Sequence, residues 1–278
     1  MNWVESNKVK LKAKRTFLKQ GTCSRTLFHI LNREFNNPKP LEENAADPLA
    51  GGINQCGYQC GMLWGAAMGV GAESYRKFNN RNQAIGVAIL ATVKMLESFK
   101  NAAKSDNCSD ITDTDWSKKF SILKYFIRGK MVTCFRLAGK WAPSALNTAI
   151  EGLSENTDSL YNDAKSCASE VIKKMGGTEE EMVMVAGFAG GYGLSGNACG
   201  ALSAAIWMNT LRRVKANSYK YAIADPEFEN IMKRFFDVTN YEIECSKICG
   251  KKFNSVAEHT EYIQNGGCEK LINILSLS

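Results

Sequence analysis

The sequence predicts an all-α protein made of two tandem homologous helical domains that pack as a pseudo-dimer. An internal duplication is the strongest sign, because residues 48–72 and 182–211 share a glycine and cysteine pattern at a shift of 139 positions. The matching positions are Gly51, Gly52, Gly57, Cys60 and Gly61 in the first copy and Gly190, Gly191, Gly196, Cys199 and Gly200 in the second. Helical periodicity also dominates the chain, and no alternating pattern typical of a strand appears.

The duplication divides the chain of 278 residues into two units of ordinary domain size. We expect a first repeat over residues 1–150 and a second repeat over residues 151–278. Both repeats carry an uncharged, glycine-rich face that needs burial, and the two faces can bury each other. The sequence therefore predicts an internal pseudo-dimer.

Helical signals divide the first repeat into four segments. In order, they cover residues 9–34 with a turn near Gly21, 61–71, 83–104, and 117–138 carrying Cys134. Residues 83–104 are apolar almost all round, which is typical of a central helix. Gly57, Gly61 and Gly65 stand four apart, and such a bare face lets another backbone approach closely.

Capping residues mark the helices of the second repeat. A linker and domain start is expected over 140–157, followed by a helix through Cys167 that stops at Gly176-Gly177. A capping box from Thr178 to Glu181 opens the next helix, and Asp225-Pro226 caps a helix over 226–238. A capping-box pattern from Ser255 to Glu258 opens the helix that ends at Gly266-Gly267. These signals predict helices only.

The formal charge of +7 is moderate, and much of it lies before Arg25. The basic residues there are Lys8, Lys10, Lys12, Lys14, Arg15 and Lys19. We interpret them as the solvated face of a first helix, because no basic stripe with interleaved aromatic residues follows. No nucleic-acid partner is therefore expected.

The uncharged runs 48–72 and 182–211 are long enough to raise the question of a membrane span. Gly-Gly pairs and polar side chains interrupt both, so we expect a buried helix, a tight turn and a second buried helix, with no membrane association. The N-terminus lacks the apolar segment of a signal peptide, which predicts a cytoplasmic location. Structural disulfides are uncommon there, so ten cysteines indicate metal binding, catalysis or reversible redox chemistry.

Eight of the ten cysteines form two matching sets of four. The first set is Cys23, Cys60, Cys108 and Cys134, and the second is Cys167, Cys199, Cys245 and Cys268. Cys56 and Cys249 lie outside these sets, each four residues from a repeated cysteine. They are candidates for extra metal ligands or for an interdomain pair, or they are incidental.

Cys60 and Cys199 directly follow the glycine-rich turns and are the candidates for redox thiols. If each begins a helix, unpaired backbone N–H groups and the helix dipole favour a thiolate there. A lowered pKa makes a thiol a better ligand and a more available nucleophile near pH 7. The neighbouring glycines leave room for a cluster, a partner cysteine or a substrate.

Two redox chemistries fit these sets of cysteines. Either the four thiols of a repeat ligate an iron–sulfur cluster, or pairs cycle between dithiol and disulfide and pass electrons to a partner protein. Buried, inert core cysteines are a further alternative. A different class also stays open, a non-catalytic module that binds an anion or a small ligand through its glycine-rich turns.

Two other patterns carry less weight. Residues 191–196 fit the dinucleotide pattern G-x-G-x-x-G, but the acidic residue that it requires is replaced by Arg212, Arg213 and Lys215. Neither histidine is repeated, and both His29 and His259 are expected on a surface or a helix face. We therefore favour neither nucleotide binding nor a histidine zinc site.

The cysteine pattern resembles the redox-active C_GCAxxG_C_C family. Its central motif corresponds to Cys199-Gly200-Ala201-Leu202-Ser203-Ala204 in the second repeat and to Cys60-Gly61-Met62-Leu63-Trp64-Gly65 in the first. The lead-in Phe188-x-Gly190-Gly191 and the cysteine after Lys165-Ser166 are also similar to the family. The resemblance covers nearly the whole chain twice and implies a helical, redox-active or metal-binding protein of bacterial type. Each copy departs from the motif at one position, which leaves open whether both are active.

Overall fold

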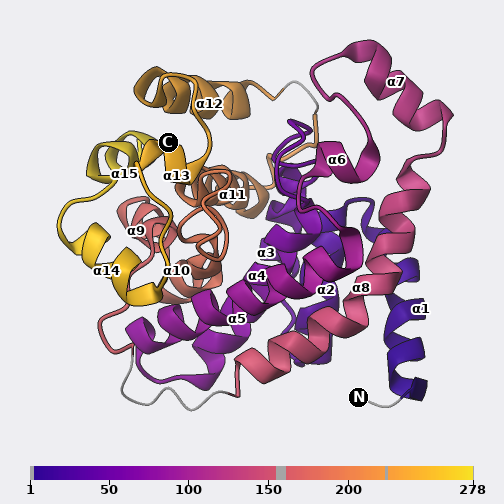
Figure 1. Cartoon of the computed structure of the whole chain (residues 1–278), viewed down its shortest axis with the longest axis horizontal. Coiled ribbons are helices and arrows are strands. Elements are labelled where there is room, and N and C mark those ends of the chain that lie inside the picture. The colour runs from indigo at the N-terminus through magenta and orange to yellow at the C-terminus, as the bar shows by residue number, and fades with distance from the viewer. Residues whose placement is uncertain (1–2, 155–160, 223–224, 278) are drawn as a thin grey trace.

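The computed structural model confirms the all-α class (Figure 1). It describes residues 3–154, 161–222 and 225–277. Over these residues the chain forms α-helices and two short 3-10 helices and no strand. The only β-type pairing within them is two isolated bridges, Gln59 with Asn107 and Ala198 with Glu244.

From the first repeated cysteine to the third, the helices of the two repeats follow the same order. Those of the first repeat are α1 (Trp3–Gln20), α2 (Cys23–Glu34), α3 (Pro40–Ala45), η1 (Asp47–Leu49), α4 (Gly61–Lys77), α5 (Arg81–Ala103), α6 (Cys108–Thr112), α7 (Lys119–Ile127) and α8 (Met131–Gly152). Those of the second are α9 (Cys167–Lys174), α10 (Glu179–Met184), η2 (Ala186–Phe188), α11 (Gly200–Lys215), α12 (Pro226–Thr239), α13 (Cys245–Ile248), α14 (Val256–Gln264) and α15 (Glu269–Leu275).

Several local predictions are confirmed. The chain turns at Gly21, which has a φ of +79°, a value that glycine adopts more readily than other residues. Helix α4 begins at Gly61 as expected. The capping box of α10 is complete, because Thr178 Oγ1 accepts from the Glu181 amide while the Glu181 carboxylate accepts from the Thr178 amide. Asp225 caps α12 through the Glu227 amide.

Two predictions about the end of the first repeat are wrong. The single helix expected over 117–138 is divided into α7 and α8 at Gly129, which adopts a φ of +62°. The linker expected over 140–157 is largely helical, because α8 continues through Pro143 to Gly152. Burial of Trp141 and Leu146 against the core favours the helix there despite the proline. Residues 155–160, which include the end of the expected linker, lie outside the described residues.

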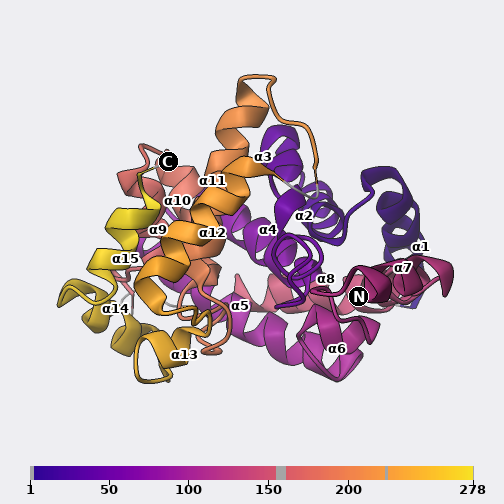
Figure 2. The same cartoon turned by 90° about the horizontal axis from the view of Figure 1, so that it is seen from above.

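The two repeats exchange contacts in a symmetric way. Helix α4 packs against α10 of the other repeat, and α11, which matches α4, packs against α3, which matches α10. Helix α5 extends beneath the second repeat and contacts η2 and α10, as Figures 1 and 2 show. This reciprocal exchange is the packing of a pseudo-dimer, as predicted.

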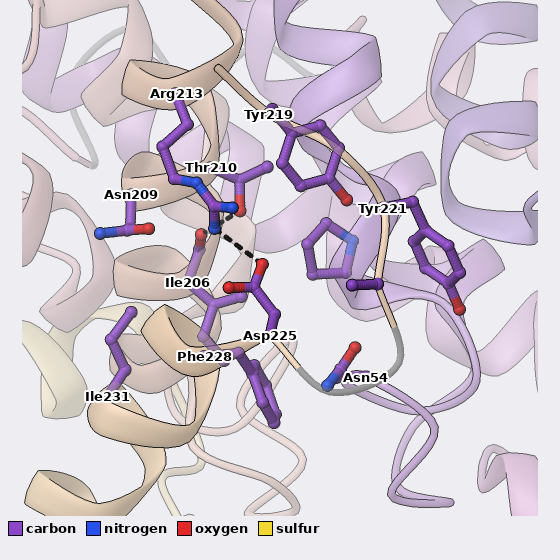
Figure 3. Close-up of a pocket in the computed structure, with 12 residues that line it drawn as sticks. Asn54, Ile206, Asn209, Thr210, Arg213, Tyr219, Tyr221, Asp225, Phe228 and Ile231 are labelled. Carbon is purple, nitrogen blue, oxygen red and sulfur yellow. Dashed lines mark hydrogen bonds and ion pairs between the residues drawn. The ribbon is translucent and has the colours of Figure 1, made fainter.

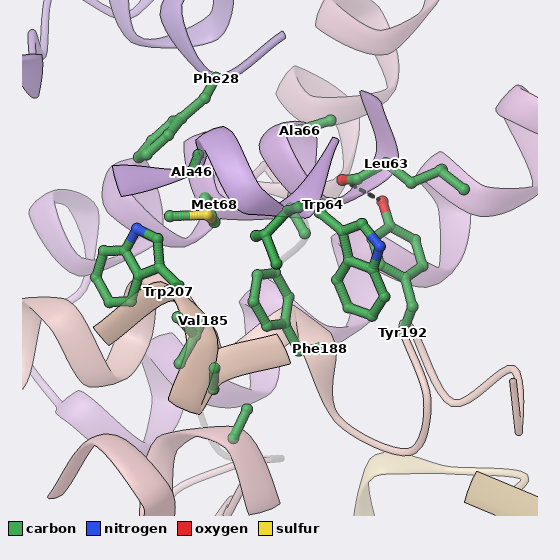
Figure 4. Packing of buried hydrophobic residues seen from close by; sticks show 14 of the residues in the cluster. Phe28, Ala46, Leu63, Trp64, Ala66, Met68, Val185, Phe188, Tyr192 and Trp207 are labelled. Carbon is green, nitrogen blue, oxygen red and sulfur yellow. Dashed lines mark hydrogen bonds between the residues drawn. The ribbon is translucent and has the colours of Figure 1, made fainter. Parts of the chain in front are cut away.

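Aromatic side chains fill the interface between the repeats (Figure 4). The fully buried Trp64 meets Phe188 and Tyr192 edge to face, with ring centroids 4.8 and 5.3 Å apart. The Tyr192 hydroxyl donates to the Leu63 carbonyl at 2.9 Å. Trp207, fully buried, donates to the Glu42 carbonyl at 3.3 Å. The apolar runs 48–72 and 182–211 are thus buried against each other.

Polar contacts reinforce the same interface. The Gln59 carboxamide accepts from the Ala198 amide at 3.1 Å, and these residues occupy matching positions 139 apart. Asn197 donates to the Asp106 carboxylate at 2.7 Å. Among the described helices, none is long and apolar enough to cross a membrane.

Candidate cysteine sites

A tight glycine-rich turn precedes Cys60 and Cys199 and has the same backbone in both repeats. The residues with positive φ are Gly51, Gly52, Ile53, Asn54, Gln55 and Gly57 in the first and Gly190, Gly191, Tyr192, Gly193, Leu194 and Gly196 in the second. A side chain at Gly52 would place its Cβ 2.4 Å from the Tyr58 backbone. The turn therefore requires glycine both for its dihedral angles and for its close self-contact.

A short antiparallel contact fixes two cysteines of each repeat beside each other. In the first repeat the Cys60 amide donates to the Asp106 carbonyl at 2.7 Å, and the Cys108 amide donates to the Tyr58 carbonyl at 2.7 Å. The matching bonds of the second repeat are Cys199 to Ile243 at 2.9 Å and Cys245 to Asn197 at 2.6 Å. The isolated bridges thus tie the second cysteine of each set to the third.

Most of the repeated cysteines lie at the beginnings of helices. Cys23 opens α2, Cys60 caps α4 and Cys108 opens α6, while Cys134 lies in the first turn of α8. In the second repeat the same positions are Cys167 at α9, Cys199 at α11, Cys245 at α13 and Cys268 at α15. The sequence prediction that Cys60 and Cys199 begin helices is correct.

In the first repeat all four cysteines line one cavity of about 150 Å³. Its wall is otherwise mostly apolar and includes Phe17, Ile111, Trp116, Tyr125, Phe126 and Met131. The Tyr125 hydroxyl lies 3.8 Å from the Cys134 sulfur. Glycine is needed at position 61, because a Cβ there would lie 2.6 Å from the Cys23 sulfur.

A segment of the second repeat contributes to the lining of this cavity. We call residues 216–222 the strap. Tyr221 of the strap lines the cavity and is hydrogen-bonded to the Gln55 side chain. Tyr219 donates to the buried Asp47 carboxylate at 3.3 Å. Figure 3 shows both tyrosines on the connection between α11 and α12, beside the Arg213–Asp225 ion pair of 2.7 Å.

The second repeat brings a fifth cysteine into its site. The Cys249 sulfur lies 3.8 Å from the Cys245 sulfur and 3.7 Å from the Cys268 sulfur. Cys56, the other unrepeated cysteine, is exposed, and its sulfur contacts the Asn54 carbonyl at 3.8 Å. Cys249 therefore joins the repeated set of its own repeat, whereas Cys56 shows no such contact.

Burial controls the thiol pKa values more strongly than the helix ends do. Burial raises the pKa of Cys199 to about 12 and that of Cys167 to about 11, although backbone amides of α11 act in the opposite direction at Cys199. The expectation of a thiolate at Cys199 is therefore wrong for this state of the protein. Burial also raises the pKa of Cys134 to about 12.

Contacts between thiols produce the two exceptions. Hydrogen bonding with Cys60 lowers the pKa of Cys23 and raises that of Cys60. Hydrogen bonds from Cys245 and then Cys268 lower the pKa of Cys249 to about 3 and raise those of its two partners. The thiol pKa is thus lowered at Cys23 and Cys249 and raised at Cys60 and Cys199.

The thiols are not grouped as ligands of one metal ion. Within the described part of the chain, no set of three or more His, Cys, Asp or Glu residues is arranged in that way. All ten cysteines are free thiols in this structure. Cysteine thiolates are also the ligands of iron–sulfur clusters, which are wider than a single ion.

The glycine-rich turns have few amides left for an anion. In the first repeat every amide from Ile53 to Tyr58 donates to a backbone carbonyl within the turn or η1. The second turn is bonded in the same way from Tyr192 to Gly196. The anion-binding alternative therefore receives no support from the backbone. The dinucleotide pattern at residues 191–196 also lacks the strand that should precede it, because the 3-10 helix η2 occupies that place.

Sequence reasoning missed several residues of the sites. His259 lies on a helix, α14, as one of the two expected placements required, but it is 1% exposed, and its Nδ1 lies 3.2 Å from the Lys165 carbonyl. Trp116, Tyr125 and Tyr221 gave no sequence signal, because they have no counterpart in the repeated pattern. Only the fold brings them to the first cavity.

The fold and its cysteine sites define an all-α protein with two tandem, internally homologous cysteine centres. The model of the family described as "Putative redox-active protein (C_GCAxxG_C_C)" matches residues 22–145 and 161–275. The chain belongs to this family and contains two tandem copies of the family's domain. Neither the comparison with curated proteins nor that with solved structures returned a match.

Proposed function

We propose that the first repeat transfers electrons through an iron–sulfur cluster held by Cys23, Cys60, Cys108 and Cys134. One observation carries this proposal: all four thiols line a single cavity of about 150 Å³. Four cysteine thiolates are the usual ligand set of such clusters. When bound, the cluster would supply one-electron oxidation and reduction.

The surroundings of the cavity support an anionic redox group. Cys23 begins α2 and Cys60 caps α4, so the positive ends of two helices of 12 and 17 residues face the thiols. The aromatic wall and Tyr221 of the strap line the same cavity as the thiols, and burial is one determinant of cluster potential. The protein's own part is to hold the thiolates, exclude water and leave room, as Gly61 does beside Cys23.

Anaerobic purification tests the proposal. We expect iron, acid-labile sulfide and visible absorption in the wild type, all strongly reduced in Cys134→Ser. Cys56→Ser is the matched control, because Cys56 is exposed and contacts no repeated cysteine sulfur. An iron-free wild type, or equal iron in both variants, would refute the cluster.

Thiol redox chemistry is the second candidate for this repeat. The presence of Cys23 and Cys60 in one cavity favours it, since neighbouring thiols can form a disulfide with loss of two protons and two electrons. An iron-free protein that reversibly loses two thiols per first repeat would support this candidate instead. A redox partner protein and a cytoplasmic location remain predictions for either chemistry.

A further inference from the structure

Cys249 distinguishes the second repeat from the first. Four residues after the third repeated cysteine, the first repeat has Thr112 and the second has Cys249. The Thr112 hydroxyl bonds back to the Cys108 carbonyl at 2.6 Å. The Cys249 sulfur instead contacts two other sulfurs, so one substitution converts a local backbone contact into a thiol cluster.

Cys249 and Cys268 are placed for pairing. Their sulfurs are 3.7 Å apart, and a disulfide bond is about 2.05 Å long, so a movement of less than 2 Å would join them. Cys249 ends α13 and is followed by Gly250, around which an added Cβ would meet no atom within 4 Å. Cys268 precedes α15 and follows Gly266-Gly267. Both sulfurs therefore lie beside connecting segments and not inside a helix.

Exposure separates this pair from the other thiols of the repeat. Cys249 and Cys268 are partly exposed, whereas Cys167, Cys199 and Cys245 are buried. Cys245 is also held by its backbone, because its amide bonds to Asn197 across the bridge between residues 198 and 244. A reagent from solution can thus reach Cys249, and Cys268 is the neighbour that is free to follow it.

We infer that Cys249 and Cys268 form a redox-active dithiol that reduces disulfides, separate from the site in the first repeat. The Cys249 thiolate attacks one sulfur of a disulfide RSSR, forms a mixed disulfide and releases RS⁻, which takes up a proton. The Cys268 thiol then loses its proton, attacks the Cys249 sulfur and releases the second RS⁻. The sum is RSSR plus two protein thiols giving two RSH plus one protein disulfide.

Peptide mapping tests the pairing directly. The wild-type chain is treated anaerobically with oxidised glutathione, remaining thiols are alkylated, and the protein is cleaved with trypsin. Lysines at 247, 251, 252 and 270 place the three cysteines on separate peptides. We expect residues 248–251 linked to residues 253–270. No linked peptide, or a link from Cys249 to the Cys245 peptide, would overturn the inference.

Matched variants make the test specific. Cys249→Thr copies the residue of the first repeat and should slow consumption of oxidised glutathione by about tenfold or more. Cys268→Ser should stop at the mixed disulfide, seen as one glutathione on residues 248–251. Cys56→Ser should behave as wild type. Undiminished consumption in Cys249→Thr would contradict the inference.

The outcome is independent of the cluster proposed for the first repeat. Iron content and visible absorption report the first site, whereas the linked peptide reports the second. An iron-free protein that forms the Cys249–Cys268 link would refute only the cluster. Loss of iron in Cys268→Ser would show that Cys268 is a metal ligand and would overturn the dithiol.

Discussion

Single residues of this protein show how strongly burial acts on ionisable groups. His259 is almost fully buried on α14, packs edge to face on Phe253 with centroids 4.9 Å apart, and contacts the Lys165 carbonyl. Burial lowers its pKa to about 4 from an ordinary 6.5. The neutral imidazole is therefore the folded form.

The shift of His259 predicts acid sensitivity. Below pH 6.5 the unfolded chain binds a proton at this histidine and the folded protein does not, so its contribution to stability is complete above pH 6.5. That contribution is lost as the pH falls from 6.5 to 4. The size of the pKa shift corresponds to about 3 kcal/mol in the free energy of unfolding. Urea unfolding of the wild type and of His259→Asn at pH 7 and pH 4.5 measures it. We expect a flatter pH dependence in the variant, and parallel pH profiles would contradict the assignment.

Among the elements, the strap is an addition to the second repeat that has no counterpart in the first. The first repeat connects α4 to α5 through residues 78–80 only, whereas the second connects α11 to α12 through residues 216–225. The longer connection reaches across the interface, where Tyr219 and Tyr221 contact the first repeat. An insertion in one repeat thus contributes Tyr221 to the lining of the cysteine cavity of the other.

Removing Tyr221 should open the first cavity. In metal-free protein we expect Tyr221→Ala to let a bulky maleimide alkylate Cys134 several-fold faster, because the ring lines the same cavity. Mass spectrometry of residues 131–136, a tryptic peptide that carries Cys134 as its only cysteine, measures the rate. Tyr221→Phe keeps the ring and loses the bond to Gln55, so it should stay close to wild type. Tyr241→Ala, an exposed tyrosine, is the control. Equal rates in all variants would show that the strap does not cover the site.

On the scale of the whole molecule, the aromatic interface joins the repeats into one unit. Trp64 is fully buried between Phe188 and Tyr192 of the other repeat. The hydrogen bond from Tyr192 to the Leu63 carbonyl crosses the same interface. Neither repeat buries this surface alone, so we expect the chain to unfold as one cooperative unit.

Trp64→Ala tests this coupling. Truncating a fully buried tryptophan removes its transfer free energy and leaves a cavity, so we expect a loss of about 3–5 kcal/mol. Denaturant unfolding followed by circular dichroism should give one transition at a lower midpoint. Phe120→Ala, at a largely exposed position on α7, should change stability by less than about 0.5 kcal/mol. Two separate transitions in the wild type would contradict the single unit.

Sequence reasoning succeeded where the signal is local. The glycines of the turns, the caps at Thr178 and Asp225 and the starts of α4 and α11 follow from dihedral preferences and capping within a few residues. It failed over residues 140–152, where a linker was expected and packing of Trp141 and Leu146 extends α8 instead. The prediction of a thiolate at Cys199 also failed. A helix start can be recognised from neighbouring residues, whereas burial, which raises the pKa of Cys199, depends on the whole fold.

The sequence by itself determined the helical class, the duplication, the membership of both cysteine sets and the turns that precede Cys60 and Cys199. The turns repeat at a shift of 139 positions and the cysteines follow in the same order, so these features can be recognised along the chain. Only the tertiary structure decided that four thiols line one cavity, that Tyr221 lines it too and that Cys249 meets Cys268. The residues involved lie tens of positions apart, so their distances and their pKa values depend on how the helices pack.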